Sequence, residues 1–267
     1  LSLRRQRQMC IRDSFYIYLF LQCLVIFSTE NLRKTFTNFP NGVFMVSLSN
    51  RTSMALFSDP MDHYSHRVRI VMEEKGVTSE IIDTDTNNLS SEILEVSPYA
   101  ELPVLVDRDV CLYDSLILME YLDERFPHPP LLPVYPVSRA HIRLFIQRIE
   151  KDWCGIFDEL ISGNQTEAKA KKLRSDLKAQ ILGMSAILKE KPYFMSDEFS
   201  LVDCCIAPIL WRLPLIGIEL QKDAKTKPIY AYMQRVFTKP CFINSLSELE
   251  RDIRSVSYTH LTLPTKA

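Results

Sequence analysis

A proline-rich run, FPHPPLLPVYP at residues 126–136, divides the sequence into two parts with different patterns. Its five prolines fix φ, remove backbone hydrogen-bond donors and favour an extended, polyproline-like path. A regular helix or strand cannot pass through such a run. We therefore expect a stiff connector here, with a separate structure on each side of it.

Before the connector, short apolar runs alternate with segments of helical spacing. The pattern predicts strands at 54–58, 81–82, 103–106 and 110–113, and helices at 65–75, 89–96 and 115–126. Pro103 opens the third of these strands, and Asp114 is expected to cap the last helix. The order strand, helix, strand, helix, strand, strand, helix is the thioredoxin-like arrangement.

After the connector, the pattern is helical throughout. Apolar residues three or four apart predict one long helix with a continuous stripe at Ile142, Ile146, Ile149, Trp153, Ile156 and Leu160. The same spacing predicts a second helix with Leu173, Leu177, Ile181, Met184 and Leu188. The expected fold class is α+β followed by all-α, with a thioredoxin-like domain at 45–126, a linker at 127–136 and a helical domain at 137–255.

The two ends of the sequence do not fit this organisation. Residues 1–44 and 256–267 show neither helical nor strand periodicity, and their outermost parts resemble translated adapter sequence. The apolar run at 15–27 follows four arginines but is shorter than the roughly 20 residues that span a bilayer, and no small-residue cleavage pattern follows it. We interpret both ends as extensions outside the fold rather than as targeting or membrane segments.

Charge and cysteine usage limit the class of function. Without the two ends, the chain holds 25 basic and 31 acidic residues, a balance that argues against direct nucleic-acid binding. Its seven cysteines form no Cys-x-x-Cys pair and are odd in number, which argues against a disulfide framework and for a reducing compartment. The cytoplasm is the expected location.

Two local clusters could carry chemistry. Ser200 and Asp203, in FSLVDC, have the spacing of a helix capping box, and no histidine lies near them to complete a catalytic triad, so we interpret them as structural. The other cluster suggests a metal site, and its members are Asp59, Asp62, His63 and His66. Because His63 is expected in the loop before the helix, we interpret these residues as solvated loop groups and predict no metal.

Several motifs carry a family resemblance. YSHRVRI after the first strand, ELPVLVD, YDSLILMEYLDERFP and SLVD together resemble glutathione transferases over residues 54–254. Longer strings in both halves are similar to the stringent starvation protein A family, an RNA-polymerase-associated bacterial branch of that superfamily. These strings are EYLDERFPHPPLLPVYP, RIEKDW, KPYFMSDEFSLVDC and APILWRLP.

The resemblance implies a test for transferase chemistry. A glutathione transferase needs a Ser, Tyr or Cys near the first helix to stabilise the glutathione thiolate. Aligning YSHRVRI with the Ser- and Cys-type families places Asp62 at that position, and the Tyr-type alignment places Phe57 there. A carboxylate would oppose the thiolate and phenylalanine offers no hydroxyl. With Ser58, Tyr64 and Ser65 as the remaining substitutes, we expect no enzyme activity and no cofactor.

The glutathione-binding half of the site is partly retained. In the family, the residue before a cis proline pairs with the peptide part of glutathione, which implies Leu102 and Pro103 here. An acid–serine pair at the next helix, Asp114 and Ser115, would hold the γ-glutamyl end. The alternative, which we favour, is that Pro103 defines a turn and Asp114 is an N-cap. A glutathione-dependent transferase and a small-ligand sensor stay open as alternative functions.

The resemblance moves the expected function to the connector. In the stringent starvation protein A family the matching segment lines a surface pocket that contacts the primary sigma factor on RNA polymerase holoenzyme. The residues that this implies are Pro127, His128, Pro129 and Tyr135. A preformed extended segment loses little entropy on docking, which suits an interface. The resemblance also implies a homodimer in the bacterial cytoplasm that regulates transcription during starvation or acid stress.

Overall fold

The computed structural model describes residues 53–108 and 110–255, so the predictions for 1–44 and 256–267 lie outside the described residues. The first half contains the seven predicted elements in the predicted order: β1 (Ala55–Ser58), α4 (His63–Glu74), β2 (Glu80–Asp83), α5 (Ser91–Val96), β3 (Val104–Asp107), β4 (Val110–Tyr113) and α6 (Ser115–Arg125). Within the described part of the chain, no helix combines the length and the apolar character needed to cross a membrane.

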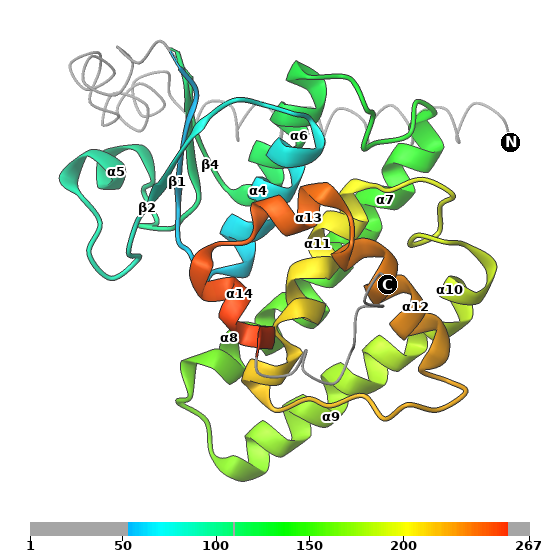
Figure 1. Cartoon of the computed structure of the whole chain (residues 1–267). Coiled ribbons are helices and arrows are strands. Elements are labelled where there is room, and N and C mark those ends of the chain that lie inside the picture. The colour runs from blue at the N-terminus through cyan, green and yellow to red at the C-terminus, as the bar shows by residue number, and fades with distance from the viewer. Residues whose placement is uncertain (1–52, 109, 256–267) are drawn as a thin grey trace, which may run out of the picture. The chain divides into compact units, whose positions relative to one another are not determined.

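The four strands form one mixed sheet in the order β2-β1-β3-β4. β1 pairs in parallel with β2 and antiparallel with β3, with Leu56 opposite Leu105. These two central strands are buried along their whole length, as expected for apolar runs covered on both faces. Helices α4 and α6 lie on one face of the sheet and α5 lies on the other (Figure 1). This is the predicted thioredoxin-like domain.

The second half is helical, also as predicted. Its elements are α7 (Pro136–Ile149), the π-helical turn η1 (Glu150–Cys154), α8 (Gly155–Ser162), α9 (Glu167–Gly183), α10 (Ser185–Glu190), α11 (Leu201–Trp211), η2 (Leu213–Ile216), α12 (Lys227–Phe237), α13 (Pro240–Ser245) and α14 (Glu248–Ser255). Every residue of α11 is buried, which makes it the central helix of this half. Apart from Asp203, its sequence, LVDCCIAPILW, is apolar on all sides, as a fully enclosed helix requires.

The predicted single helix from Ile142 to Leu160 is wrong in one respect. The turn η1 interrupts it, because a π turn bonds five residues ahead and so accommodates one more residue than an α turn. The buried face therefore shifts along the chain. Phe157 is buried, whereas Ile156, which we predicted in the stripe, is only half-buried.

Helix α4 joins the two halves into one core. It packs against α6 beside the sheet and against α11 and α13 of the helical half. Nine of its twelve residues are buried, and they include Arg67 and Arg69. A helix enclosed in this way must satisfy its charged side chains internally. The buried arginines of α4 therefore need acceptors from neighbouring elements.

The connector differs from the extended path that we predicted. Residues 126–135 make a series of bends, and the His128–Pro129 peptide bond is cis. Leu131 and Leu132 enter the core, where they are 2% and 4% exposed, and the Leu131 carbonyl accepts from the amide of Leu201 (3.1 Å). The segment is therefore anchored in the core rather than free as a spacer.

Candidate functional site

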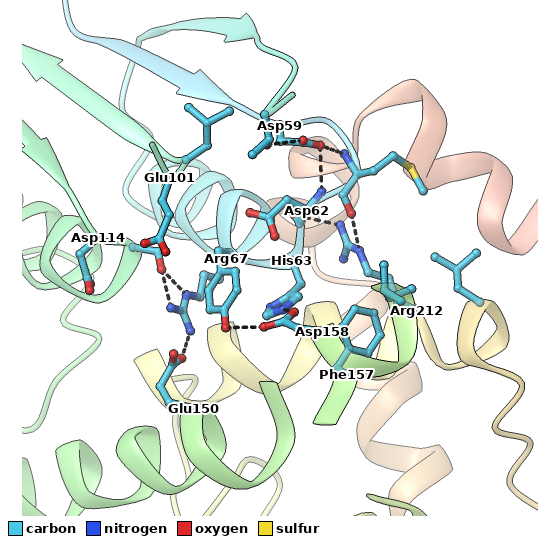
Figure 2. Close-up of a pocket in the computed structure, with 17 residues that line it drawn as sticks. Asp59, Asp62, His63, Arg67, Glu101, Asp114, Glu150, Phe157, Asp158 and Arg212 are labelled. Carbon is cyan, nitrogen blue, oxygen red and sulfur yellow. Dashed lines mark hydrogen bonds and ion pairs between the residues drawn. The ribbon is translucent and has the colours of Figure 1, made fainter. Parts of the chain in front are cut away.

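A cleft with a volume of about 580 Å³ lies beside the N-terminus of α4. One wall comes from the loop after β1, from α4 and from the start of α6. The facing wall comes from η1, α8 and the end of α11 (Figure 2). Of the positions that the family resemblance implied, the structure brings together Asp62, Leu102, Asp114 and Ser115 in this lining.

Asp62 has a structural task in this cleft. It is the N-cap of α4, and its carboxylate accepts from the Ser65 amide at 2.7 Å. Asp59 folds the preceding loop by accepting from the amides of Met61 (2.8 Å) and Asp62 (3.2 Å). Carboxylates are favoured at a helix N-terminus because they satisfy its free amides and match its dipole. Asp62, the residue aligned with the thiolate donor, therefore caps the N-terminus of α4.

None of the substitute hydroxyls is poised to hold a thiolate. Ser58 is fully buried and accepts from Arg69, and the Ser65 hydroxyl accepts from the Asp59 amide (3.1 Å). The Tyr64 hydroxyl donates to Asp158 Oδ2 at 2.9 Å. Burial, together with neighbouring Cys154 and carboxylates, raises the pKa of Tyr64. A tyrosine that stabilises a thiolate needs the opposite environment.

The pair Asp114 and Ser115 is also engaged internally. Asp114 is the N-cap of α6 and accepts from the amides of Leu116 (2.9 Å) and Ile117 (3.3 Å). The Ser115 hydroxyl accepts from both Nε (3.0 Å) and a terminal nitrogen of Arg67. The Leu102–Pro103 peptide bond is cis, as predicted, and Leu102 but not Pro103 lines the cleft.

Sequence reasoning did not identify Arg67 as a site residue. Its side chain is 2% exposed and pairs with Glu150 of η1, and its guanidinium lies 4.7 Å from the centre of the Tyr64 ring. Figure 2 shows Arg67 between the start of α6 and Glu150. The only signal in the sequence was a pair of arginines, Arg67 and Arg69, on a helix that the apolar spacing buries. Such arginines require buried acceptors.

Our interpretation of His63 and His66 as solvated loop residues was wrong. His63 is the first residue of α4, and both histidines are buried. His63 Nε2 lies 2.8 Å from Asp158 Oδ1 of α8, a bond across the two halves. His66 Nδ1 lies 2.9 Å from a terminal nitrogen of Arg212, so it accepts, and Nε2 then donates to Ser245. Burial and Arg212 lower the pKa of His66 well below its usual value.

The described residues, with their gap at 109, hold no group of three or more His, Cys, Asp or Glu side chains arranged for a metal ion. The cluster that suggested such a site is instead divided between two tasks. Asp59 and Asp62 fold the loop before α4, whereas His63 and His66 bond to the helical half.

A second buried network ties the cleft loop to the last helix. Glu250 of α14 is fully buried and pairs with both Arg69 (2.6 Å) and Arg212. Arg212 also donates to the carbonyl oxygens of Met61 (3.0 Å) and Asp62 (3.2 Å), which form the rim of the cleft. One carboxylate thus serves two buried arginines, and those arginines hold the rim.

Acidic side chains dominate the lining of the cleft. Two arginines also face it, but Arg67 pairs with Glu150 and Arg212 pairs with Glu250. The carboxylates in the lining are Asp59, Asp62, Glu101, Asp114, Glu150 and Asp158. Glutathione carries two carboxylates and one ammonium group. The lining therefore presents like charge to the two carboxylates of that ligand and opposite charge to its ammonium group.

The connector offers a different kind of surface. Pro127, His128 and Pro129 are exposed, and Tyr135 is 76% exposed. A cavity of about 430 Å³ lies beside them, but its connector lining is Pro130, Leu131, Leu132, Pro133 and Val134. None of the four residues implied by the resemblance lines this cavity. They stand on the open surface next to it.

The capping box expected at the start of α11 is present. Asp203 Oδ2 accepts from the Ser200 amide (2.9 Å) and hydroxyl (2.9 Å), and the Ser200 side chain accepts in return from the Asp203 backbone. Asp203 Oδ1 accepts from the Phe194 amide (3.0 Å) and from Tyr232 (2.8 Å). Burial raises the pKa of Asp203 to about 6, although these bonds oppose the shift.

An apolar face lies between α6 and α7. Ile117 is 55% exposed and Leu144 58% exposed, although both are large apolar residues. Between these helices is a cavity of about 650 Å³ lined mainly by Leu116, Met119, Ala140, Leu144, Ile146 and Leu201. The bidentate pair of Arg143 and Glu120, with both nitrogen–oxygen distances 2.7 Å, lies at its rim.

Comparison with known proteins gives matches over most of the described region. Residues 56–130 match the family model of the glutathione S-transferase N-terminal domain, and residues 135–240 match that of the C-terminal domain. The chain is 49% identical to a stringent starvation protein A homolog of Haemophilus ducreyi over 75% of this chain and 93% of the relative. It is 47% identical to the homolog of Coxiella burnetii, over 77% and 97%.

A solved structure shares the fold. A Tau class glutathione S-transferase from mango, Mangifera indica, superimposes with a TM-score of 0.67 at 22% identity and covers 78% of this chain and 98% of its own.

Proposed function

Since the chain belongs to the stringent starvation protein A family, within the glutathione S-transferase superfamily, we propose that it is a non-enzymatic regulator of transcription. It binds RNA polymerase holoenzyme through the primary sigma factor, in the bacterial cytoplasm, and changes promoter output during starvation or acid stress. The observation that carries this proposal is that most polar groups of the cleft already have partners within the chain, while the connector presents exposed His128 and Tyr135.

The state of the cleft supports the absence of transferase activity. Asp62 caps α4, Tyr64 is bonded to Asp158, and the Ser115 hydroxyl is occupied by Arg67. Catalysis of conjugation depends on a donor positioned at the developing thiolate. Tyr64 would have to leave its bond to Asp158 to serve, and the acidic lining opposes the anion that it would stabilise.

The state of the connector supports a protein partner. His128 and Tyr135 are exposed rings, each with an apolar body and a polar group, and such residues are enriched at interfaces. The backbone beside them is anchored by buried Leu131 and Leu132. A partner that docks here orders little additional chain, so more of the contact energy remains as affinity.

Capture of RNA polymerase holoenzyme by the full chain tests the proposal. We expect the variant with Pro127, His128 and Pro129 all changed to Ala to lose at least about tenfold in capture, as the loss of a central contact group predicts. The matched control changes Lys171, Lys172 and Asp176, three exposed residues of α9, to Ala and should capture as well as the wild type. Equal capture by wild type and the connector variant would refute the docking surface.

We also propose that the face between α6 and α7 pairs with a second copy of the chain. Exposed Ile117 and Leu144 flank an apolar cavity, and Glu120 and Arg143 on its rim carry opposite charges, so the patch is complementary to itself under a two-fold axis. Light scattering should find a dimer for the wild type and a monomer for Leu144→Asp. A control, Ile161→Asp on α8, changes an equally exposed apolar residue away from this face.

A glutathione-dependent activity, or a small-ligand sensor on the same fold, is the alternative. The observation that favours it is that Leu102, Asp114 and Ser115 still line one cleft beside a cis proline. A glutathione conjugation assay and a thermal-shift titration with glutathione test it together. We expect neither turnover nor a shift, and turnover that disappears in Tyr64→Phe would reverse the ranking of the two functions.

A further inference from the structure

The backbone of the connector is held by a buried ion pair. Lys75, the C-cap residue of α4, has a side chain that is 0% exposed, and its Nζ lies 2.6 Å from Asp123 Oδ1 of α6. The same ammonium group donates to the carbonyl oxygen of Pro129. Asp123 Oδ1 also accepts from the amide of Leu131 at 2.8 Å. The pair thus bonds the connector on both sides of Pro130.

These bonds matter because a proline-rich segment has few other ways to be fixed. Proline lacks an N–H group, and residues 126–135 lie outside every helix and strand, so no regular bonding pattern sets their path. The Leu131 amide is one of the few donors available. Both the ammonium group and the carboxylate make charge-assisted bonds, which are stronger than bonds between neutral groups.

An ion pair is a costly way to fill this space. Two charges lose their hydration when buried, and well-packed apolar residues of similar size are often equally stabilising. What apolar residues cannot supply is a donor for the Pro129 carbonyl and an acceptor for the Leu131 amide. The presence of a lysine and an aspartate at these positions is therefore explained by the two backbone groups that they bind, the Pro129 carbonyl and the Leu131 amide. Pro129 directly follows exposed His128 in the chain.

We propose that Lys75 and Asp123 are positioning residues for the docking surface. They touch no partner, since both are buried, and they act by fixing the backbone of Pro129 and Leu131, which sets how Pro127, His128 and Pro129 are presented. This inference rests on the proposed function of the connector. It adds two residues, from α4 and α6, on which binding of RNA polymerase depends.

The test replaces the pair without emptying its space. The double variant Lys75→Met with Asp123→Leu, in the full chain, keeps the site filled and removes both bonds to the connector. We expect exchange of the Leu131 amide, followed by NMR, to be at least about tenfold faster, since its acceptor is gone. Holoenzyme capture should weaken at least about tenfold in urea-free buffer, where the variant is folded, and the urea midpoint is expected to fall because the Pro129 carbonyl and the Leu131 amide lose their partners.

The matched control is a neighbouring pair that does not touch the connector. Lys239 Nζ lies 3.2 Å from Glu74 Oε1, and Glu74 directly precedes Lys75 in the chain. The variant Lys239→Met with Glu74→Leu should leave Leu131 exchange and capture at wild-type values. If the first double variant does not fold, Asp123→Asn decides, because it keeps an acceptor oxygen and should shift both readouts in the same direction by less.

Two results would overturn the positioning role: unchanged exchange at Leu131, or wild-type capture despite faster exchange. Failure of the proposed function would give a different result. In that case the variant with Pro127, His128 and Pro129 changed to Ala captures holoenzyme as the wild type does, and there is no docking surface for the pair to position.

Discussion

In the cleft, most polar side chains that face the cavity are bonded within the chain, whereas in the connector His128 and Tyr135 face solvent and the backbone is bonded instead. Arg67, for example, uses its guanidinium on Ser115 and Glu150. His128 stands exposed on a segment held through the Pro129 carbonyl and the Leu131 amide. The two regions belong to one fold, yet they differ in which groups they leave without partners.

This difference teaches that a retained motif is a weak guide to a retained activity. Asp114 and Ser115 are the positions that the resemblance implied for ligand binding, but their oxygens already have partners within the chain. Whether a site can bind depends on the donors and acceptors that are left over. By that measure, the connector is the more available of the two surfaces. Four predictions test this comparison.

The largest effect is expected from Glu250→Ala. The substitution leaves buried Arg69 and Arg212 without their shared carboxylate and should lower the free energy of unfolding by roughly 3–5 kcal/mol. Urea unfolding followed by tryptophan fluorescence measures it. The control Glu167→Ala breaks an exposed pair with Arg174 and should cost less than about 1 kcal/mol. A similar cost for both variants would mean that the network does not hold the cleft side together.

The next effect separates the buried and exposed parts of the connector. Leu131→Ala removes a side chain that is 2% exposed and should cost roughly 2–5 kcal/mol of unfolding free energy. Tyr135→Ala changes a side chain that is 76% exposed and should stay within about 0.5 kcal/mol. If Leu131→Ala were as mild as Tyr135→Ala, the connector would be a spacer after all.

A pH dependence is expected from Asp203, which caps the helix whose first amide bonds the connector. Its pKa is raised to about 6 when folded and lies near 3.9 when unfolded. The folded chain therefore holds more protons between about pH 4 and pH 6, and this group's contribution to the unfolding free energy falls as pH rises through that window. The difference between wild type and Asp203→Asn should change by up to roughly 3 kcal/mol across it.

Urea titrations of both proteins across this range isolate the contribution, because the other carboxyl groups are common to both. A difference that rises with pH would contradict the assignment.

The smallest effect is expected from Asp62→Ser in the cleft. Serine is also a good N-cap, so the free energy of unfolding should change by less than about 0.5 kcal/mol. The substitution places a hydroxyl at the position where Ser-type transferases carry theirs. We still expect no conjugation of glutathione, because Ser115 remains bonded to Arg67 and the other carboxylates remain. Turnover in this variant would show that one residue separates the cleft from a working site.

Most of the fold could be predicted from sequence because its signals are local. Apolar spacing located the strands and helices, and Ser200 and Asp203 marked the start of α11, whereas the cis bond before Pro103 was implied by the family resemblance. Errors arose where a residue's environment comes from distant chain. His66 was expected to be solvated, but it is buried, and its partners are Ser245 and Arg212.

The same reason hid the centre of the cleft. Arg67 is bonded to Glu150, which lies 83 residues further along the chain. His63 is bonded to Asp158, which lies 95 residues further along. No spacing rule connects such positions. The one available signal was Arg67, a charged residue on a helix face predicted to be buried. Such a residue requires an acceptor, but the sequence does not identify which residue provides it.

The π turn at Glu150–Cys154 also sets the geometry of the whole cleft wall. Each residue in an α-helix advances about 100° around the axis, so one residue more or less turns everything beyond it by that angle. Deleting a single residue from this turn would keep the composition of α8 but swing Asp158 away from His63 and Tyr64. The number of residues in this turn, and not only their identity, therefore determines which side chains of α8 contact α4.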